Sequence, residues 1–441
     1  MAEDHQGFFG RANQILPVSM RYGQYRYYWL ALFAGVTGHQ MLLQFTMGWT
    51  MFELTGEKLD LTYLGMAIAL PAIFFNLAGG MLADRLEPKY LVAGAQAVSA
   101  TVVAWLATMV LTGGVDVWHL LVTAAVIGSV QALDQPSRAS VFARLVRSEH
   151  IVNAVAMESI IWNAVRILGP LIAGVLVQRV SIEASMFTTA ATFYVLGSVV
   201  SILRLRQRPP AQGQVLRQVV AGIAYVRGHS IFSLIMLLTF CNSMFGMAYV
   251  YLMPVFAKEV LDVGAEKIGW LFGATGFGAI LGTLVIGKLK AHHPLGLIML
   301  GGAILYGVGL LLFALATSKQ MYLASMGILV ATGAVHSLYI TGGIAALQNL
   351  VPDQIRGRVM GLYAITWSLG PLSMAYGGPV ADAFGAPQAV ATGAAVVIVV
   401  AVAILVASPQ LRSLPVRVSD AVRDSYQLMP TSQPGRGDAP H

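Results

Sequence analysis

The sequence has few charged residues. Only 11% of its 441 residues are Asp, Glu, Lys or Arg, whereas 57% are hydrophobic and the mean hydropathy is +0.71. Soluble domains usually carry about 25% charged residues. A charged side chain at the centre of a bilayer costs roughly 2.5–3.5 kcal/mol, so this deficit is typical of an integral membrane protein.

Cysteine is almost absent, and the common catalytic motifs are missing. The single cysteine, Cys241, excludes an internal disulfide. We find no HExxH pair, no GxSxG and no Cys/His cluster with metal-ligand spacing, so we expect no enzyme activity, no cofactor and no metal. The first 27 residues lack a short apolar core with a small-residue cleavage site, so we expect no cleaved signal peptide.

Long apolar runs are abundant, and each is long enough to cross a bilayer as a helix. Six runs precede a basic, proline-containing break and six follow it. We therefore predict an all-α integral membrane protein of twelve transmembrane helices in two pseudo-symmetric six-helix bundles, residues 28–203 and 230–408. The predicted spans are 28–52, 62–83, 90–112, 118–135, 152–177, 184–203, 230–256, 268–287, 295–316, 321–348, 359–381 and 386–408.

Three segments lie outside the predicted bundles. Residues 1–27 form a cytoplasmic N-terminal segment in this scheme. Residues 204–229 form a cytoplasmic linker, in which apolar residues at helical spacing from Val215 onward predict an amphipathic helix at the interface between the two halves. Residues 409–441 are expected to form a disordered cytoplasmic tail.

The distribution of basic residues predicts the orientation in the membrane. The net charge is +7, and 21 Lys and Arg residues fall on the side of the two termini, against five on the other side, which also holds nine acidic residues. This is the positive-inside bias, so we expect both termini in the cytoplasm. The basic charge then faces anionic lipid headgroups, which argues against a nucleic acid as partner.

The two halves also contain a weak internal repeat. The segments LVRSEHIVNAVAMESIIW from Leu145 and LVPDQIRGRVMGLYAITW from Leu350 are offset by 205 residues, and each is followed by a Gly-Pro pair. A repeat at half the chain length is typical of transporters built from parallel repeats. Two halves that rock about a central site provide alternating access.

The segment GGMLADRLEPKYL, which follows the second predicted span, resembles the cytoplasmic loop signature of the major facilitator superfamily. Its matching residues are Gly80, Asp84, Arg85 and Lys89. The resemblance implies a gate in which Asp84 and Arg85 make a charge-assisted contact at a helix end. Glu87 and Pro88 depart from the pattern, and a simple basic turn is the alternative interpretation.

A narrower resemblance extends over residues 22–205. The motifs WTMFELTG, DQPSRASVFARLV and RILGPLIAG occur in order, beginning at Trp49, Asp134 and Arg166. They resemble the enterobactin-exporter-like and macrolide-efflux-like branch, the transmembrane secretion effector group. This resemblance implies export of a small amphipathic molecule across the cytoplasmic membrane, driven by proton antiport. An uptake symporter or a lysolipid transporter of the same fold is the alternative, and we expect a monomer in contact with membrane lipids.

Ionisable residues within spans are candidates for proton coupling because of their cost in a bilayer. Asp134 and Glu158 lie near the same end of consecutive spans, where two carboxylates would repel each other and favour binding of a proton. Arg166 lies about 12 Å beyond Glu158 along the helix, so it needs another partner, a watery cavity or the substrate. The alternative for Asp134 is an i,i+4 pair with Arg138 at the gate, and for Glu158 a structural pair.

Two further groups of residues complete the candidate site. In the fifth span, Gly169, Pro170 and Gly174 resemble an antiporter motif and predict a hinge with close helix contact. The resemblance also implies that the first, fourth, seventh and tenth spans line a cavity. The candidate cavity residues, with two aromatic residues of the eleventh span, are His39, Gln40, Gln44, Gln131, Asn242, His336, Tyr339, Tyr363 and Trp367.

Overall fold

The computed structural model describes residues 17–83, 87–206, 223–288 and 293–415, and nearly all of them are helical. The first half consists of six long helical segments in which α2, the π-helical turn η2 and α3 are continuous. Their bounds are α2 (Gly23–Met41), η2 (Leu42–Thr46), α3 (Met47–Thr55), α4 (Lys58–Ala83), α5 (Pro88–Leu111), α6 (Val117–Leu145), α7 (Ile151–Arg179) and α8 (Ile182–Ile202).

The second half repeats this arrangement. Its first segment is again interrupted, and its fifth segment is interrupted as well, whereas the fifth segment of the first half, α7, is continuous. The first segment comprises α10 (Ser230–Cys241), η4 (Asn242–Gly246), α11 (Ala248–Tyr251), α12 (Met253–Val255) and η5 (Phe256–Val260). The others are α13 (Ala265–Gly287), α14 (Leu295–Ser318), α15 (Tyr322–Leu350), α16 (Asp353–Ser368) with η6 (Gly370–Ser373) and α17 (Met374–Phe384), α18 (Ala386–Ala407) and the short α19 (Pro409–Arg412).

The predicted all-α fold with two six-helix bundles is confirmed. Within the described ranges, ten helical stretches are long and apolar enough to cross a membrane. The other two predicted spans are the interrupted segments Gly23–Thr55 and Asp353–Phe384. The predicted gate residues Asp84 and Arg85, most of the predicted linker helix and the predicted tail beyond residue 415 lie outside the described residues.

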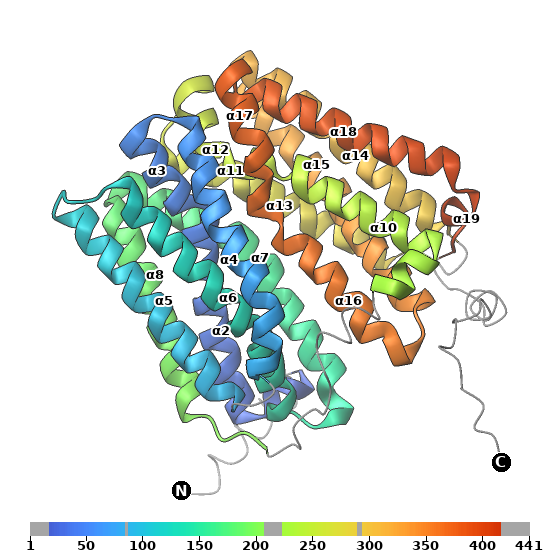
Figure 1. Ribbon diagram of the computed structural model, residues 1–441, viewed down its shortest axis with the longest axis horizontal. Coiled ribbons are helices and arrows are strands. Elements are labelled where there is room, and N and C mark those ends of the chain that lie inside the picture. The colour runs from blue at the N-terminus through green and yellow to red at the C-terminus, as the bar shows by residue number, and fades with distance from the viewer. Residues whose placement is uncertain (1–16, 84–86, 207–222, 289–292, 416–441) are drawn as a thin grey trace, which may run out of the picture.

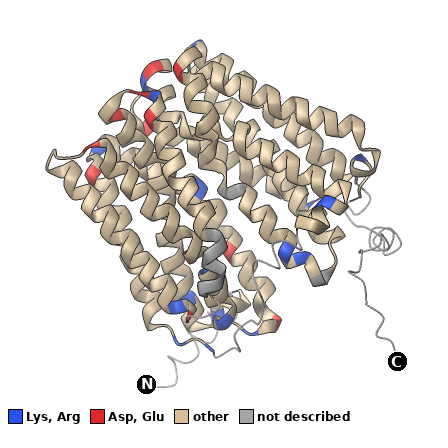
Figure 2. Cartoon of the chain, in the orientation of Figure 1, with Lys and Arg blue, Asp and Glu red and all other residues tan. Residues whose placement is uncertain are grey.

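The two bundles lie side by side and diverge toward the end of the molecule where α2 begins and α19 lies (Figure 1). We call this end the terminal side and the opposite end the far side. Lys and Arg are concentrated on the terminal side, whereas Asp and Glu gather mainly on the far side (Figure 2). Charge is thus separated along the direction in which the helices would cross a membrane.

Each bundle has its own apolar core, and a third core joins them. The core of the first half includes Tyr25 and Tyr28, and that of the second half includes Phe232 and Tyr339. The joining core includes Phe45 of the first half and Phe272 of the second, whose rings meet edge to face at 6.4 Å. Because this shared core lies toward the far side, the halves are held together there.

Close helix packing depends on glycine at particular positions. A Cβ added to Gly282 of α13 would lie 2.1 Å from the carbonyl oxygen of Ala334 in α15, so only glycine allows this approach. Across the halves, a Cβ on Gly174 of α7 would lie 2.7 Å from the Ala265 oxygen of α13. Close contact of this kind is typical of membrane helices, in which packing replaces the hydrophobic effect as the driving force.

Candidate transport site

A central cavity of about 170 Å³ lies where the two halves meet. Four helical segments of the first half and two residues of the second half enclose it. Its wall is mostly amide and apolar, with one tryptophan and one tyrosine. The lining residues are His39, Gln40, Leu43, Gln44, Ile68, Ala72, Gln131, Ala132, Gln135, Trp162, Tyr251 and Pro371.

Four of the predicted cavity residues therefore line this space: His39, Gln40, Gln44 and Gln131. Gln44 lies in the π-helical turn η2, and π-turns inside helices are frequent at functional sites. His39 and Gln131 join α2 to α6 through a contact of 3.0 Å between His39 Nε2 and the Gln131 side-chain amide. The sequence analysis missed Trp162 and Tyr251 as aromatic wall residues.

The remaining predicted cavity residues belong to the second half. Asn242 lies in η4, a π-turn in the first segment of the second half, and its side chain contacts the His336 ring at 3.4 Å. His336 also stacks on Tyr306 with ring centroids 4.2 Å apart. Tyr339 and Tyr363 lie in the apolar core of the second half, outside the cavity wall, and Tyr339 donates a hydrogen bond to Thr239. The side chain of Trp367 lies outside the described residues.

A second, smaller cavity lies inside the first half, next to the central one. Its volume of about 20 Å³ suits a single water molecule, which needs roughly 10–15 Å³. His39 and Gln131 line both cavities, and Gln96, Ser99, Asp134 and Arg138 line the smaller one. A polar route therefore leads from the central cavity to the buried Asp134.

Asp134 and Arg138 form the i,i+4 ion pair that was the alternative interpretation of Asp134. Arg138 Nε lies 2.9 Å from Asp134 Oδ2, and both side chains are buried. The second carboxylate oxygen, Asp134 Oδ1, is also buried, and the side chain of Gln96 lies close to the carboxylate. Glu158 forms no ion pair with Arg138 among the described contacts but lies within electrostatic range of its guanidinium.

The three predicted hinge residues of α7 lie against neighbouring helices. Gly169 faces α2, where an added Cβ would lie 2.6 Å from the Gln40 side chain. Pro170 and Gly174 face α13 of the other half. Of the predicted gate residues, Gly80 lies in α4, and Lys89 lies in the first turn of α5 with its ammonium 4.8 Å from the centroid of the Tyr90 ring.

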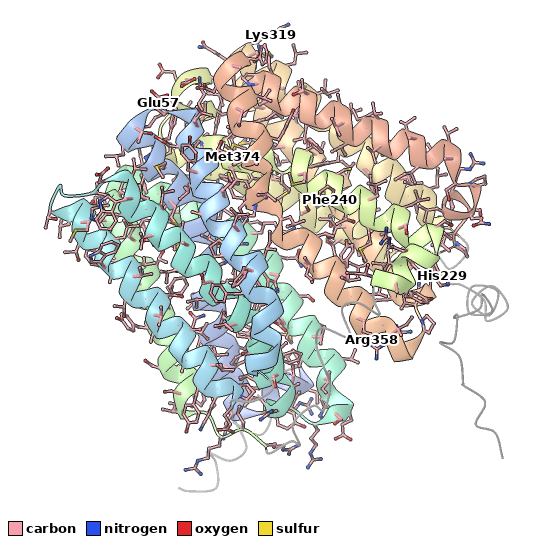
Figure 3. All side chains as sticks on the ribbon, in the orientation of Figure 1. Glu57, His229, Phe240, Lys319, Arg358 and Met374 are labelled. Atoms are coloured by element: carbon pink, nitrogen blue, oxygen red, sulfur yellow. The ribbon has the colours of Figure 1, made fainter. Side chains whose placement is uncertain are left out.

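On the far side, ion pairs that the sequence analysis did not predict connect the two halves. Thr62 of α4 also donates a 3.0 Å hydrogen bond to the Met374 oxygen of α17, where Figure 3 labels Met374 beside α4. Together these contacts close the far side. The ion pairs are Lys58–Glu259 at 2.8 Å, Arg179–Glu266 at 2.8 Å and Lys258–Glu53.

Two bundles closed on one side around a central polar cavity define a transporter of the major facilitator fold. Solved structures with this fold include a bacterial homologue of the lysosomal transporter Spinster, inward-facing and occupied, with a TM-score of 0.69 at 14% identity, covering 90% of this chain and 99% of that one. The nucleoside transporter NupG gives a TM-score of 0.65 at 14% identity over 86% of this chain and 98% of that one.

The sequence comparisons define the family more closely. A family model described as transmembrane secretion effector matches residues 17–430. The chain belongs to this family of membrane transporters, which are not enzymes.

Bacterial relatives are similar to this chain over most of their length. The MFS-type transporter YfiS of Bacillus subtilis strain 168 is 26% identical, covering 74% of this chain and 79% of the relative. The multidrug efflux pump Tap of Mycolicibacterium fortuitum is 24% identical over 75% and 82%. The enterobactin exporter EntS of Escherichia coli O1:K1 is 25% identical over 68% and 72%.

Proposed function

We propose that this protein exports a small amphipathic molecule across the cytoplasmic membrane by alternating access, in exchange for protons. The observation that carries the proposal is the polar route from the central cavity through His39 and Gln131 to the Asp134–Arg138 pair. A carboxylate buried at membrane depth is costly unless it is paired or functional. Here the carboxylate is paired with Arg138 and also adjoins space for a water molecule, from which a proton can reach it.

Proton binding at Asp134 supplies a switch. Protonation removes the charge that holds Arg138, so the guanidinium is left with Glu158 as its other nearby carboxylate. An uncompensated buried charge is strongly destabilising. When Asp134 is protonated, the Arg138 guanidinium is therefore attracted toward Glu158. Because Arg138 lies in α6 and Glu158 in α7, this changes the packing between the two helices. The two helices lie on the cavity wall, through Gln131 and Trp162, so this change reaches the substrate site.

The direction of transport is supported by charge and by the relatives. The basic terminal side fits the cytoplasm under the positive-inside rule (Figure 2). The far side is closed in this structure, so substrate would enter from the cytoplasm. The relatives Tap and EntS are a multidrug efflux pump and an enterobactin exporter. One proton moving down 100 mV supplies about 2.3 kcal/mol, enough for a gradient of roughly fifty-fold.

The test measures proton release from everted, acid-loaded membrane vesicles when amphipathic compounds are added. We expect at least one compound to collapse the gradient in the wild type but not in Glu158→Gln. The matched control is Glu149→Gln, which removes an exposed carboxylate near the start of the same helix and should behave as the wild type. If every compound leaves the wild-type gradient intact, proton-antiport export is refuted for that panel. Uptake symport and lysolipid transport would then be tested next.

A further inference from the structure

The contacts of neighbouring residues in α7 indicate the direction in which the Arg166 side chain points. On one side of it, Gly169 contacts Gln40 of α2 in the first half. On the other side, Ile167 contacts Gly276 of α13 in the second half, where an added Cβ would lie 2.2 Å from the Ile167 side chain. At about 100° per residue, Arg166 projects between these two contacts. It therefore points toward the central space between the halves.

The surroundings of Arg166 agree with this direction. It lies one helical turn beyond Trp162, which lines the central cavity. From the second half, Tyr249 and His336 lie within electrostatic range of its guanidinium. The side chain of Arg166 is also exposed.

Within the described part of the chain, Arg166 has no anionic partner. Among the residues that the structure describes, its guanidinium forms no hydrogen bond and no ion pair. Arg138, the other arginine in the interior of the first half, is instead paired with Asp134. An uncompensated cation at membrane depth is expensive to maintain, so its presence indicates a role in binding or transport.

We infer that Arg166 binds the anionic group of the transported molecule, and that the substrates are amphipathic monoanions with a carboxylate or a similar planar acid. This inference rests on the proposed function, since it assigns a substrate class to the same cavity. A guanidinium binds a carboxylate through two parallel hydrogen bonds, which a neutral side chain cannot reproduce. Trp162 offers an aromatic surface one turn away for the apolar part of the molecule.

A matched series of fluorescent probes tests this assignment on the purified full-length protein. N-dansyl-6-aminohexanoate, its primary amide and N-dansyl-1,6-diaminohexane share a fluorophore and a chain and differ mainly in terminal charge. Equilibrium dialysis in detergent, with protein-free micelles subtracted, gives the Kd of each. The variants are Arg166→Gln, Arg166→Lys and, as a control that removes an exposed far-side cation, Lys319→Gln (Figure 3).

In the wild type we expect the carboxylate to bind about tenfold tighter than the amide, or more, and the amine to bind least. Arg166→Gln should lose this preference while the amide binds as before. Arg166→Lys should keep part of it, since lysine supplies a point charge without the planar fork. Lys319→Gln should match the wild type. The inference is overturned if the wild type does not bind the carboxylate, shows no preference for it, or keeps the preference in Arg166→Gln.

A second measurement needs no variant, so it also holds if Arg166→Gln fails to fold. Phenylglyoxal modifies accessible guanidinium groups, and mass spectrometry follows the peptide that contains Arg166. The carboxylate probe should slow this modification and the amide should not. Equal protection by both probes, or by neither, contradicts the assignment.

Both measurements are made without a proton gradient, which separates them from the test of the proposed function. Selective carboxylate binding together with proton-independent transport would refute antiport and leave the role of Arg166 intact. Proton release by neutral compounds alone, without a preference for the carboxylate, would support antiport and refute the role of Arg166.

Discussion

The far-side ion pairs predict how the equilibrium between the two open states responds to charge. Lys258 and Glu259 are neighbours in η5 of the second half, and they bind Glu53 and Lys58 of the first half. Exchanging the two charges of η5, by Lys258→Glu with Glu259→Lys, places like charges opposite each other at both contacts. The net charge of the protein is unchanged, so long-range effects are minimised.

The expected magnitude follows from the exposure of these pairs. Their side chains are 19–48% exposed, so each attraction contributes about 0.2–1 kcal/mol. Like charges at the same spacing cost a similar amount. Converting two attractions into two repulsions therefore destabilises the far-side-closed state by about 0.8–4 kcal/mol. At 1.4 kcal/mol per tenfold, its population relative to the far-side-open state falls by about 4-fold to several hundred-fold.

Distance measurements between spin labels follow this shift directly. Labels at Thr112→Cys and Lys319→Cys place one probe on each half at the far side, in a Cys241→Ser background. Electron double resonance should show a longer-distance population in the swapped variant. High salt should weaken the effect, because exposed charges are screened.

Restoring complementarity is the control. Adding Glu53→Lys and Lys58→Glu to the swapped variant recreates both pairs with opposite polarity, and the short distances should return. The reasoning is refuted if the double exchange leaves the distances unchanged, or if the fourfold variant fails to restore them while remaining monodisperse.

The other predictions concern packing, burial and membrane potential. Gly282→Leu should prevent stable folding, because a Cβ at this position would lie 2.1 Å from the Ala334 oxygen. The control is Gly287→Ala, where an added Cβ meets only open space. This control should have the melting temperature of the wild type in fluorescence-detected gel filtration. Arg138→Gln leaves Asp134 buried without its cation and should cost about 3–5 kcal/mol, seen as a lower melting temperature that Asp134→Asn partly restores. Export of one monoanion in exchange for one proton moves two charges across the membrane, so an interior-negative potential of 100 mV adds about 4.6 kcal/mol of driving force. Such a potential should accelerate efflux in valinomycin-clamped vesicles. An efflux rate that does not depend on the potential would contradict an anionic substrate.

The twelve spans could be predicted because a bilayer requires long apolar runs, and their order follows directly from the sequence. The interruptions within the helical segments could not be predicted. The turns η2 and η4 each contain one extra residue in a helical turn, and nothing in LLQFT or NSMFG marks it. Such turns depend on contacts made after the helices pack, as when Thr46 of η2 meets Ser185 of α8 at 2.9 Å.

Side-chain direction limited the prediction of the site. The Asp134–Arg138 pair followed from i,i+4 spacing, which is local. Tyr339 was expected in the cavity because it lies in the tenth predicted span, yet it lies in the core of the second half. The position of a residue along the chain determines its span but not the rotation of its helix, which depends on packing. The direction of Arg166 likewise depends on the glycine contacts on either side of it.

The far-side contact between Glu53 and Lys258 could have been predicted from the spacing of these two residues in the sequence. The two residues are 205 positions apart, the same offset as the internal repeat. Equivalent positions of two repeats lie in contact when they fall near the pseudo-twofold axis. Opposite charges at equivalent positions therefore predict a contact between the halves, and this criterion applies to other transporters built from parallel repeats.

The central claim is proton-driven export through the cavity between the halves, and transport into proteoliposomes tests it most directly. Purified protein is reconstituted with an acidic lumen, and accumulation of N-dansyl-6-aminohexanoate is followed together with the lumenal pH. The account predicts uphill accumulation coupled to alkalinisation of the lumen, abolished by a proton ionophore and by Glu158→Gln. Equilibration to equal concentrations with no effect of the ionophore would contradict it.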